Sequence, residues 1–591
     1  MMFRIKKYKL MYKNGLFVVL LALLALSSCK KYLDRDPFDK LTPEQAFANE
    51  NNLQLYVNSF YSSMLPDGPA IYQGDVMSDV TVPNNVPNYI SGRLSSQEAT
   101  GWSWGNLRNI NYFLEHYDNP DIPEGARNHY AGIARYFRAF FYYQMVKQFG
   151  DVPWYNKAMT VDDPDLYKGR DPRSMVMDSV LADLNFATAH IRDTKDNSAT
   201  QITKWVALAL KSRVCLFEGT FRKYHPEMGL SGTANTWLQE AADAADILIK
   251  SGQYQLQNTG NPDLDYRSLF ISENPVSSEV LLAAVYNNSL KKWHNATWWF
   301  NSATLGARLG LDKRLINTYL MIDGSSFTNQ PDYAKLEFQD EVKNRDKRLQ
   351  QTIRMGDYKR TDGSPAPPDF TVTYSGYQIQ KFSLDDKYYD TRTESYNSIP
   401  IVRYAEVLLN YAEAKAELGT FTAADWTLTI GALRARAGIS GSLMPVSPDT
   451  YLQTNFYPDV QDAVILEVRR ERAVELAAEG QRYDDLRRWK AGNLLEKVYT
   501  GLYVPAKGKV LDLNGDGRPD VSFVDQVPDN KVNGVVYFVI DNNSSKLSEG
   551  DHGNLIWLSN IKKTYDDRHY SYPIPANELI LNPNLEQNPG W

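Results

Sequence analysis

The amino-acid sequence predicts a mainly α-helical protein: a tetratricopeptide-like scaffold of paired helices, with a large irregular insertion that contains short strands. Two observations carry this prediction. Stretches with apolar residues three and four positions apart recur on both sides of a less regular region, roughly residues 253–400. One stretch, residues 203–219, carries Trp205, Leu208 and Ala209 in the W-x-x-L-[GA] arrangement with which tetratricopeptide helices begin.

Helical segments fill most of the chain before the insertion. Apolar spacing predicts helices over residues 46–63, 104–117, 124–149, 174–190, 203–219 and 235–250. Residues 66–101 are rich in Pro, Asn, Gly and Ser and predict a long loop, a kind of segment that often carries binding residues. We therefore place an N-terminal helical domain at residues 46–252.

The remaining residues, 253–591, are predicted to form a C-terminal domain. Its parts are the insertion at about 253–400, a helical part at 401–500 and a loop-rich part at 501–591. Within the insertion, residues 278–286 have the composition of a strand. Residues 404–418 and 425–437 predict another helix pair, so the scaffold continues after the insertion.

Residues 464–489 are the most strongly patterned stretch. Apolar residues fall on one helix face, and glutamates recur at every fourth position from Glu467 to Glu479 with arginines between them. Charges at this spacing pair along one helix or with neighbouring helices. We interpret the charged face as structural rather than catalytic, because such runs usually stabilise or solvate a helix. Gly480 predicts the end of the first helix, and residues 482–489 a short second one.

The N-terminus reads as a secretory signal, residues 1–28. Positive residues precede an apolar core at 16–26, which is shorter than the roughly 20 residues needed to span a membrane. Leu26-Ser27-Ser28-Cys29 has the pattern of a bacterial lipoprotein cleavage site. We therefore expect Cys29 to be the lipidated first residue of the mature chain, with residues 29–45 as a tether.

Charge and cysteine content exclude several classes of protein. The full chain has a formal charge of −7, and removal of a signal with five positive residues leaves about −12. Such an acidic chain is unsuited to nucleic acid, whose phosphates require a basic surface. With Cys29 lipidated, Cys215 has no partner for an intrachain disulfide, and its apolar neighbours predict a buried thiol.

No motif for catalysis is present. The seven histidines are scattered, and the sequence has no H-E-x-x-H, G-x-S-x-G or phosphate-binding loop. We therefore predict a protein that is not an enzyme and requires no cofactor. A surface glycoside hydrolase remains an alternative, because a retaining glycosidase needs only two carboxylates about 5 Å apart.

One loop has the oxygen donors of a structural calcium site. Asp512, Asn514, Asp516 and Asp520 occupy its positions 1, 3, 5 and 9, with a glycine at position 6. Phe523 stands at position 12, where an EF-hand has a glutamate. The loop is thus either a calcium loop of another kind or a solvated turn.

Several motifs resemble one known family. Residues 471–489 match ER-x-x-EL-x-x-EG-x-R-x-x-DL-x-RW, the signature of the SusD/RagB family of outer-membrane nutrient-binding lipoproteins. Residues 138–153, which end in FGDVP, and 344–349 (NRDKRL) resemble two further elements of this family. The ending, residues 572–591, resembles it as well, with Trp591 in place of the usual tyrosine. The resemblance extends from Cys29 to Trp591.

This resemblance implies a fold, a cellular location and a function. The fold would be the SusD-like α-α superhelix, anchored by lipid to the outer face of the outer membrane of a Bacteroidetes-type bacterium. The protein would capture oligosaccharides or polysaccharides without catalysis and deliver them to a SusC-like TonB-dependent transporter. Two alternatives of other kinds are a family member that captures peptides and a purely structural lipoprotein that uses its helix pairs for protein contacts.

The family binds glycans with aromatic residues, whose rings stack on sugar CH faces while amides bind hydroxyls. In this sequence, two loop-like regions correspond to those of the family's sites. Their candidate residues are Trp102, Trp104 and Asn106 in the first region and Tyr286, Trp293, Trp298, Trp299 and Asn301 in the second. Core packing is the alternative for each tryptophan, and we expect Trp102 and Trp298 to be the better candidates. Convergence on one exposed pocket would favour sugar capture, and burial would remove that argument.

Overall fold

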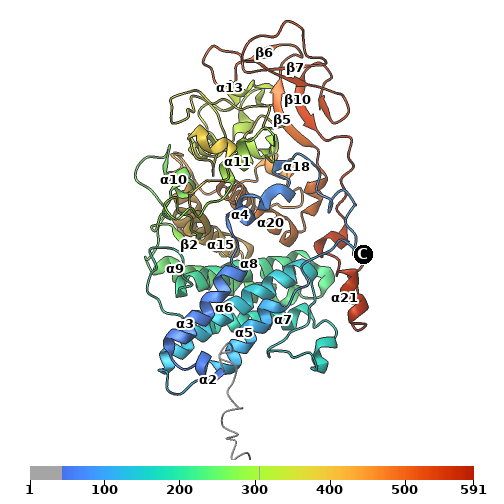
Figure 1. The fold of residues 1–591 in the computed structure, drawn as a ribbon. Coiled ribbons are helices and arrows are strands. Elements are labelled where there is room, and N and C mark those ends of the chain that lie inside the picture. The colour runs from blue at the N-terminus through green and yellow to red at the C-terminus, as the bar shows by residue number, and fades with distance from the viewer. Residues whose placement is uncertain (1–42, 305) are drawn as a thin grey trace, which may run out of the picture.

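The computed structural model describes residues 43–304 and 306–591 (Figure 1). The predicted signal peptide and lipidated Cys29 lie outside these residues, as does most of the tether. The protein is mainly helical with short strands, which confirms the predicted fold class. Figure 1 shows the N-terminal helices packed together in the lower half of the molecule and the C-terminal strands at the top.

Helices make up most of the regular structure in the N-terminal part of the described chain. They are α2 (Pro43–Ala46), α3 (Glu50–Met64), α4 (Gly68–Tyr72), α5 (Gly105–His116), α6 (Glu124–Phe149), α7 (Arg173–His190), α8 (Lys204–Tyr224) and α9 (Ala234–Lys250). Helix α6 packs on α7, and α8 packs on α9. Cap residues explain where helices begin and end: the Thr203 side chain accepts from the backbone of Val206 at the start of α8, and Gly150, with φ of +76°, ends α6.

The scaffold continues after the insertion. Its helices are α15 (Tyr404–Glu417), α16 (Ala423–Trp426), α17 (Ala432–Arg436), α18 (Thr450–Asn455), α19 (Ala463–Glu475) and α20 (Arg482–Arg488). A π-helical turn, η9 (Thr427–Gly431), joins α16 to α17. Helix α15 packs against α9, α8 and α19, so it joins the two halves of the scaffold. Cys215 lies fully buried in this core, as expected.

The insertion is built from short elements. They are α10 (Asp265–Ile271), β2 (Val280–Ala284), α11 (Ala296–Asn301), β3 (Gly310–Leu311), α12 (Lys313–Ile316), α13 (Phe338–Glu341), α14 (Lys347–Thr352) and β4 (Ile399–Arg403). Strand β2, which the sequence predicted, pairs antiparallel with β4. Strand β3 pairs antiparallel with β1 (Thr81–Val82) from the long N-terminal loop.

The C-terminal part, predicted as loop-rich, contains two small sheets that the sequence did not predict. In one, β10 (Gly553–Trp557) lies between β5 (Tyr499–Val504) and β9 (Ser545–Leu547). In the other, β7 (Val521–Val524) pairs antiparallel with β6 (Val510–Leu511) and parallel with β8 (Val536–Val539). A last helix, α21 (Ala576–Leu581), lies near the C-terminus beside the N-terminal helices (Figure 1).

The most strongly patterned stretch forms α19 and α20, joined by a tight turn. The turn needs Gly480, which has φ of +74° and lies against Gly74 of the long N-terminal loop. A Cβ on Gly74 would lie 2.6 Å from the Cα of Gly480, which is closer than two carbon atoms can approach. Glycine at both positions therefore allows the two backbones to touch.

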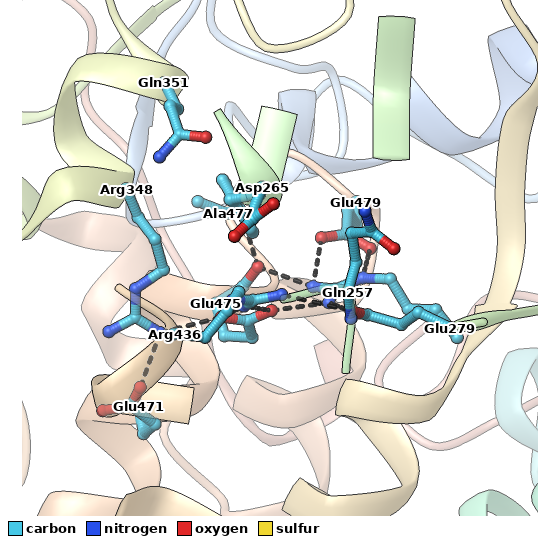
Figure 2. Close-up of polar contacts among 12 residues, drawn as sticks. Gln257, Asp265, Glu279, Arg348, Gln351, Arg436, Glu471, Glu475, Ala477 and Glu479 are labelled. Carbon is cyan, nitrogen blue, oxygen red and sulfur yellow. Dashed lines mark hydrogen bonds and ion pairs between the residues drawn. The ribbon is translucent and has the colours of Figure 1, made fainter. Parts of the chain in front are cut away.

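The glutamates of α19 face the interior. Glu475 is fully buried and receives hydrogen bonds from Arg348, Arg403 and Arg436, which come from three other elements. Figure 2 shows Arg348 and Arg436 beside Glu475. Glu471 pairs with Arg348 and Arg434. The charged face thus connects α19 to its neighbours and does not solvate it.

Candidate functional site

A groove of about 700 Å³ opens beside the first predicted tryptophan region. Its walls are the start of α5, the segment of residues 153–167 and helix α21. We call it the tryptophan groove, because Trp102 and Trp104 lie in its wall. Its volume is within the roughly 300–1,000 Å³ of small-molecule sites.

The aromatic wall is continuous with the N-terminal core. The rings of Trp102 and Trp104 meet edge to face, with centroids 5.4 Å apart, and Trp102 also packs edge to face on Phe149 at 5.0 Å. Trp104 meets Tyr155 edge to face at 5.4 Å. Trp102 is 9% exposed and Trp104 is half-buried, whereas Tyr167 is 53% exposed. Tyr167 therefore offers more free ring surface than either tryptophan.

Polar side chains hold the wall in place. The amide nitrogen of Asn111 donates to the carbonyls of Tyr155 (2.9 Å) and Lys157 (3.1 Å). Arg108 donates from Nε to the carbonyl of Met159 at 2.8 Å. These bonds fix the segment of residues 153–167 against α5. Burial, with nearby aspartates, raises the pKa of Tyr155 to about 12, so its hydroxyl keeps its proton at neutral pH.

The rest of the lining combines exposed aliphatic side chains with a few polar ones, among them Lys157, Thr160 and Asn582. Val161 is 87% exposed, Leu166 37% and Leu581 67%, so the rim presents apolar surface to solvent. Glu578 is the one acidic side chain among the described residues that line the groove. The groove consequently lacks the carboxylate pair that glycosidases use.

The other predicted residue of the first region has a packing role. The side-chain amide of Asn106 donates to the carbonyl of Ser63 at 3.2 Å and so connects α5 to the end of α3. Asn106 is not part of the groove lining.

The second predicted region lies elsewhere. Trp298, Trp299 and Asn301 belong to α11, and Trp299 packs on a core separate from that of the tryptophan groove. Trp293 is half-buried and donates from Nε1 to Asn288 at 3.1 Å. Trp298 is half-buried as well. None of the second region's candidates lines the tryptophan groove, so that groove does not bring the two regions together.

Two candidates of the second region hold the fold together. The Tyr286 hydroxyl accepts from the backbone of Gly68 at 2.9 Å, and the side chain is 7% exposed. Asn301 Oδ1 accepts from Arg354 (2.9 Å) and Gln378 (3.0 Å). Tyr286 thus joins the insertion to the N-terminal part of the chain, and Asn301 joins segments within the insertion.

The candidate calcium loop forms a closed turn. The Asp512 carboxylate accepts from the backbone of Gly515 (2.6 Å) and Gly517 (2.8 Å), and Asp520 accepts from Leu513 (2.7 Å). Asn514 and Asp516 accept from the backbone two residues further on. Burial raises the pKa of Asp520 to about 6, and the charges of Asp512 and Asp516 contribute to this shift. In the described part of the chain, no three His, Cys, Asp or Glu side chains are grouped to hold a metal ion.

Most of the groove was not predicted from the sequence. Val161 lies in a loop, Leu166 and Tyr167 in a four-residue 3₁₀ turn, and Leu581 at the end of the six-residue helix α21. These elements are too short to show apolar periodicity, so nothing in the sequence marks the four residues as neighbours. Exposure of large apolar side chains marks such surfaces, and it is visible only in the folded chain.

Comparisons with known proteins agree with the fold. The chain is 26% identical over 533 residues to SusD-like protein P2 of Formosa agariphila, which covers 83% of this chain and 92% of that protein. A SusD-like protein of Bacteroides fragilis superposes with a TM-score of 0.67 at 21% identity, covering 94% of this chain and all of that one. A SusD-like carbohydrate binding protein of the same species also has a TM-score of 0.67 at 21% identity, covering 92% of this chain and all of the other.

Two family models match the sequence. One, described as starch-binding associating with outer membrane, matches residues 31–216. Across the described residues, no helix is both long and apolar enough to cross a membrane. The model of the SusD family matches residues 280–591, more than half of the chain, and the protein therefore belongs to the SusD family.

Proposed function

We propose that this protein is a lipid-anchored surface protein that captures oligosaccharides or polysaccharides and delivers them to a partner TonB-dependent transporter of the outer membrane. It performs no chemistry on the ligand. Cys29 carries the lipid, and the mature chain faces the cell exterior. The names of related proteins support this function: one solved relative is a SusD-like carbohydrate binding protein, and one matching family is described as starch-binding associating with outer membrane.

The observation that carries the proposal is the aromatic surface of the tryptophan groove. Tyr167 and Trp104 present ring faces or edges to a cavity of about 700 Å³, and sugar rings bind such surfaces through their CH faces. Polar groups of Lys157 and Asn582 lie in the same lining and suit hydroxyl groups. The absence of a carboxylate pair among the described lining residues supports capture without turnover.

A specific observation favours peptide capture as the second candidate. The rim of the groove also presents the aliphatic side chains of Val161, Leu166 and Leu581. Aliphatic side chains have no ring face for a sugar but bury well against apolar peptide side chains. The ligand class therefore depends on which part of the lining dominates binding.

The test is titration calorimetry of the mature chain, from residue 30 onward, with polysaccharides, oligosaccharides and peptides. Tyr167→Ala removes the most exposed ring of the groove without opening a core cavity. Loss of this stacking surface is expected to weaken glycan binding by about tenfold, which corresponds to about 1.4 kcal/mol. Tyr388→Ala is the matched control, because Tyr388 is 48% exposed and lies outside the groove.

The outcomes separate the candidates. Glycan binding that Tyr167→Ala weakens and Tyr388→Ala leaves intact supports glycan capture in the groove. Peptide binding with the same pattern, and no glycan binding, moves the function to peptide capture. Glycan affinity that is equal in both variants contradicts the placement of the site.

A further inference from the structure

A second groove, of about 490 Å³, lies in another part of the molecule. It is formed by two 3₁₀ turns of the insertion, η6 (Phe327–Asn329) and η7 (Tyr333–Lys335), and by helix α18. Its lining shares no residue with the tryptophan groove. In Figure 1, α18 lies in the upper half of the molecule, whereas α5 and α21 of the tryptophan groove lie in the lower half. We call it the hydroxyl groove.

The lining of the hydroxyl groove consists largely of hydroxyl and amide side chains. Helix α18 contributes Tyr451, Thr454 and Asn455, and the two turns contribute Asn329 and Tyr333 from the other side. Tyr451 and Asn455 are four residues apart and so share one helix face. The Tyr451 hydroxyl donates to the carbonyl of Arg314 (3.3 Å) and accepts from Asn317 (3.2 Å), so Thr454 and Asn455 are the side chains of α18 that offer polar groups to the groove.

Several of these polar groups are available to a ligand. Within the described residues, the side chains of Asn329, Tyr333 and Thr454 make no hydrogen bond. The Asn455 amide nitrogen donates to the carbonyl of Tyr451 at 3.0 Å, which leaves its carbonyl oxygen as an acceptor. The groove therefore offers both donors and acceptors, as a ligand with many hydroxyls requires.

The acidic side chains of the hydroxyl groove are already neutralised. The Asp449 carboxylate accepts from the Ser326 hydroxyl (2.6 Å) and the Leu452 backbone (3.0 Å), and it pairs with Arg470. Glu467 pairs with Arg434 and lies 3.4 Å from Arg470. With both carboxylates paired to arginines, the groove holds no free charge for a metal ion or an ionic ligand. This favours a neutral ligand.

Two tyrosines supply ring surface in the same groove. The rings of Tyr333 and Tyr451 stand at 89° with centroids 6.2 Å apart, so they form two adjacent walls. Tyr333 packs edge to face on buried Phe327 at 5.8 Å. Asp332, with φ of +54°, adopts the left-handed conformation that turns the chain into η7 and sets the place of Tyr333.

We infer that the hydroxyl groove is a second carbohydrate-binding site, which holds a short stretch of neutral glycan between Tyr333 and α18. Tyr333 stacks on a sugar face, and Thr454, Asn455 and Asn329 bind its hydroxyls. The ligand class rests on the proposed function, but the site does not depend on the tryptophan groove. A glycan long enough to reach both sites at once would be held more tightly than by either site alone.

The test titrates the mature chain with neutral oligosaccharides, namely maltoheptaose, cellohexaose, xylohexaose and mannohexaose, and with their parent polysaccharides. Tyr333→Ala removes the stacking surface, and Thr454→Val removes one hydroxyl while keeping the shape. Thr454 is exposed and Tyr333 is half-buried, and thermal unfolding checks that the variants fold. We expect each variant to weaken binding of at least one of these neutral glycans, by about tenfold for Tyr333→Ala.

Comparison with Tyr167→Ala separates this inference from the proposed function. If Tyr333→Ala weakens binding and Tyr167→Ala does not, the hydroxyl groove is a site and the tryptophan groove is not. If only Tyr167→Ala weakens binding, the second site is refuted while the proposed function stands. Binding of these neutral glycans that is absent, or unchanged in both Tyr333→Ala and Thr454→Val, refutes the second site.

Discussion

Arg436 and Glu475 form a buried ion pair in which one guanidinium nitrogen lies 2.6 Å from each of the two carboxylate oxygens. Their side chains are 1% and 0% exposed. Arg348 and Arg403 approach the same carboxylate at 2.7 and 2.5 Å. Figure 2 shows Glu475 with Arg436 and Arg348. Glu475 thus joins α14, β4 and α17 to α19. The family signature in α19 therefore contributes to a buried junction between elements.

Substitution of Glu475 tests the junction. Glu475→Gln removes the charge that three buried arginines share, and loss of one partner of a buried pair typically costs about 3–5 kcal/mol. We expect a loss of this size in the free energy of urea unfolding. The control is Glu337→Gln, whose ion pair with Lys509 is about half exposed and is expected to contribute less than about 1 kcal/mol. Equal losses of unfolding free energy in Glu475→Gln and Glu337→Gln would contradict the stabilising role of Glu475.

Asp75 is expected to destabilise the protein at neutral pH. It is 1% exposed, and burial raises its pKa from 3.8 to about 6, although the backbone and charge of Arg482 oppose this shift. The pKa of Asp75 is higher in the folded than in the unfolded chain. The protonated carboxyl group therefore makes its full contribution to the free energy of unfolding below pH 3.8, and this contribution is lost as the pH rises to about 6. Asp75→Asn should therefore be more stable than the wild type at pH 7.5, by about 1–3 kcal/mol.

The measurement for Asp75 is chemical unfolding of both proteins from pH 4 to 7.5. The difference in unfolding free energy should shrink as the pH falls from about 6 to about 4. A difference that is independent of pH, or a variant less stable at pH 7.5, would show that the carboxylate is stabilised by its neighbours.

Membrane attachment is expected to depend on Cys29. Cys29→Ser removes the sulfur that accepts the lipid, and several acyl chains on one residue are what make anchoring stable. In cells, the variant should move from the detergent phase to the aqueous phase of a Triton X-114 extract. Retention in the detergent phase would contradict lipidation at this residue.

Calcium binding at Asp512–Asp520 remains a prediction. A divalent cation would relieve the repulsion among Asp512, Asp516 and Asp520, but the backbone hydrogen bonds of the closed turn would have to rearrange. We expect calcium to raise the midpoint of thermal unfolding and Asp512→Asn to abolish this effect. If neither calcium nor a chelator changes the midpoint, the loop is a solvated turn.

The helical scaffold could be predicted because its signals are local. Apolar spacing and caps such as Thr203 and Gly150 specify helix positions within a few residues. The role of Glu475 could not be predicted, because its arginine partners come from segments up to 127 residues away. The small C-terminal sheets were missed because their strands are two to six residues long and are separated by glycine-rich turns.

The sites were predicted only in part. Aromatic composition drew attention to Trp102 and Trp104, which lie in the wall of a groove. The most exposed ring there, Tyr167, and the opposite wall, α21, have no sequence pattern that relates them. The hydroxyl groove was missed for the same reason: Tyr333 and Tyr451 lie 118 residues apart in the sequence, and single hydroxyl residues are common on any surface.

The most direct test of the central claim, capture without turnover, measures binding and ligand length in one sample. The mature chain is titrated with a panel of glycans, and each glycan is recovered afterwards and sized by chromatography. The account predicts saturable binding to at least one glycan whose length is unchanged after prolonged incubation. Shortened products, or no binding to any glycan, would contradict it.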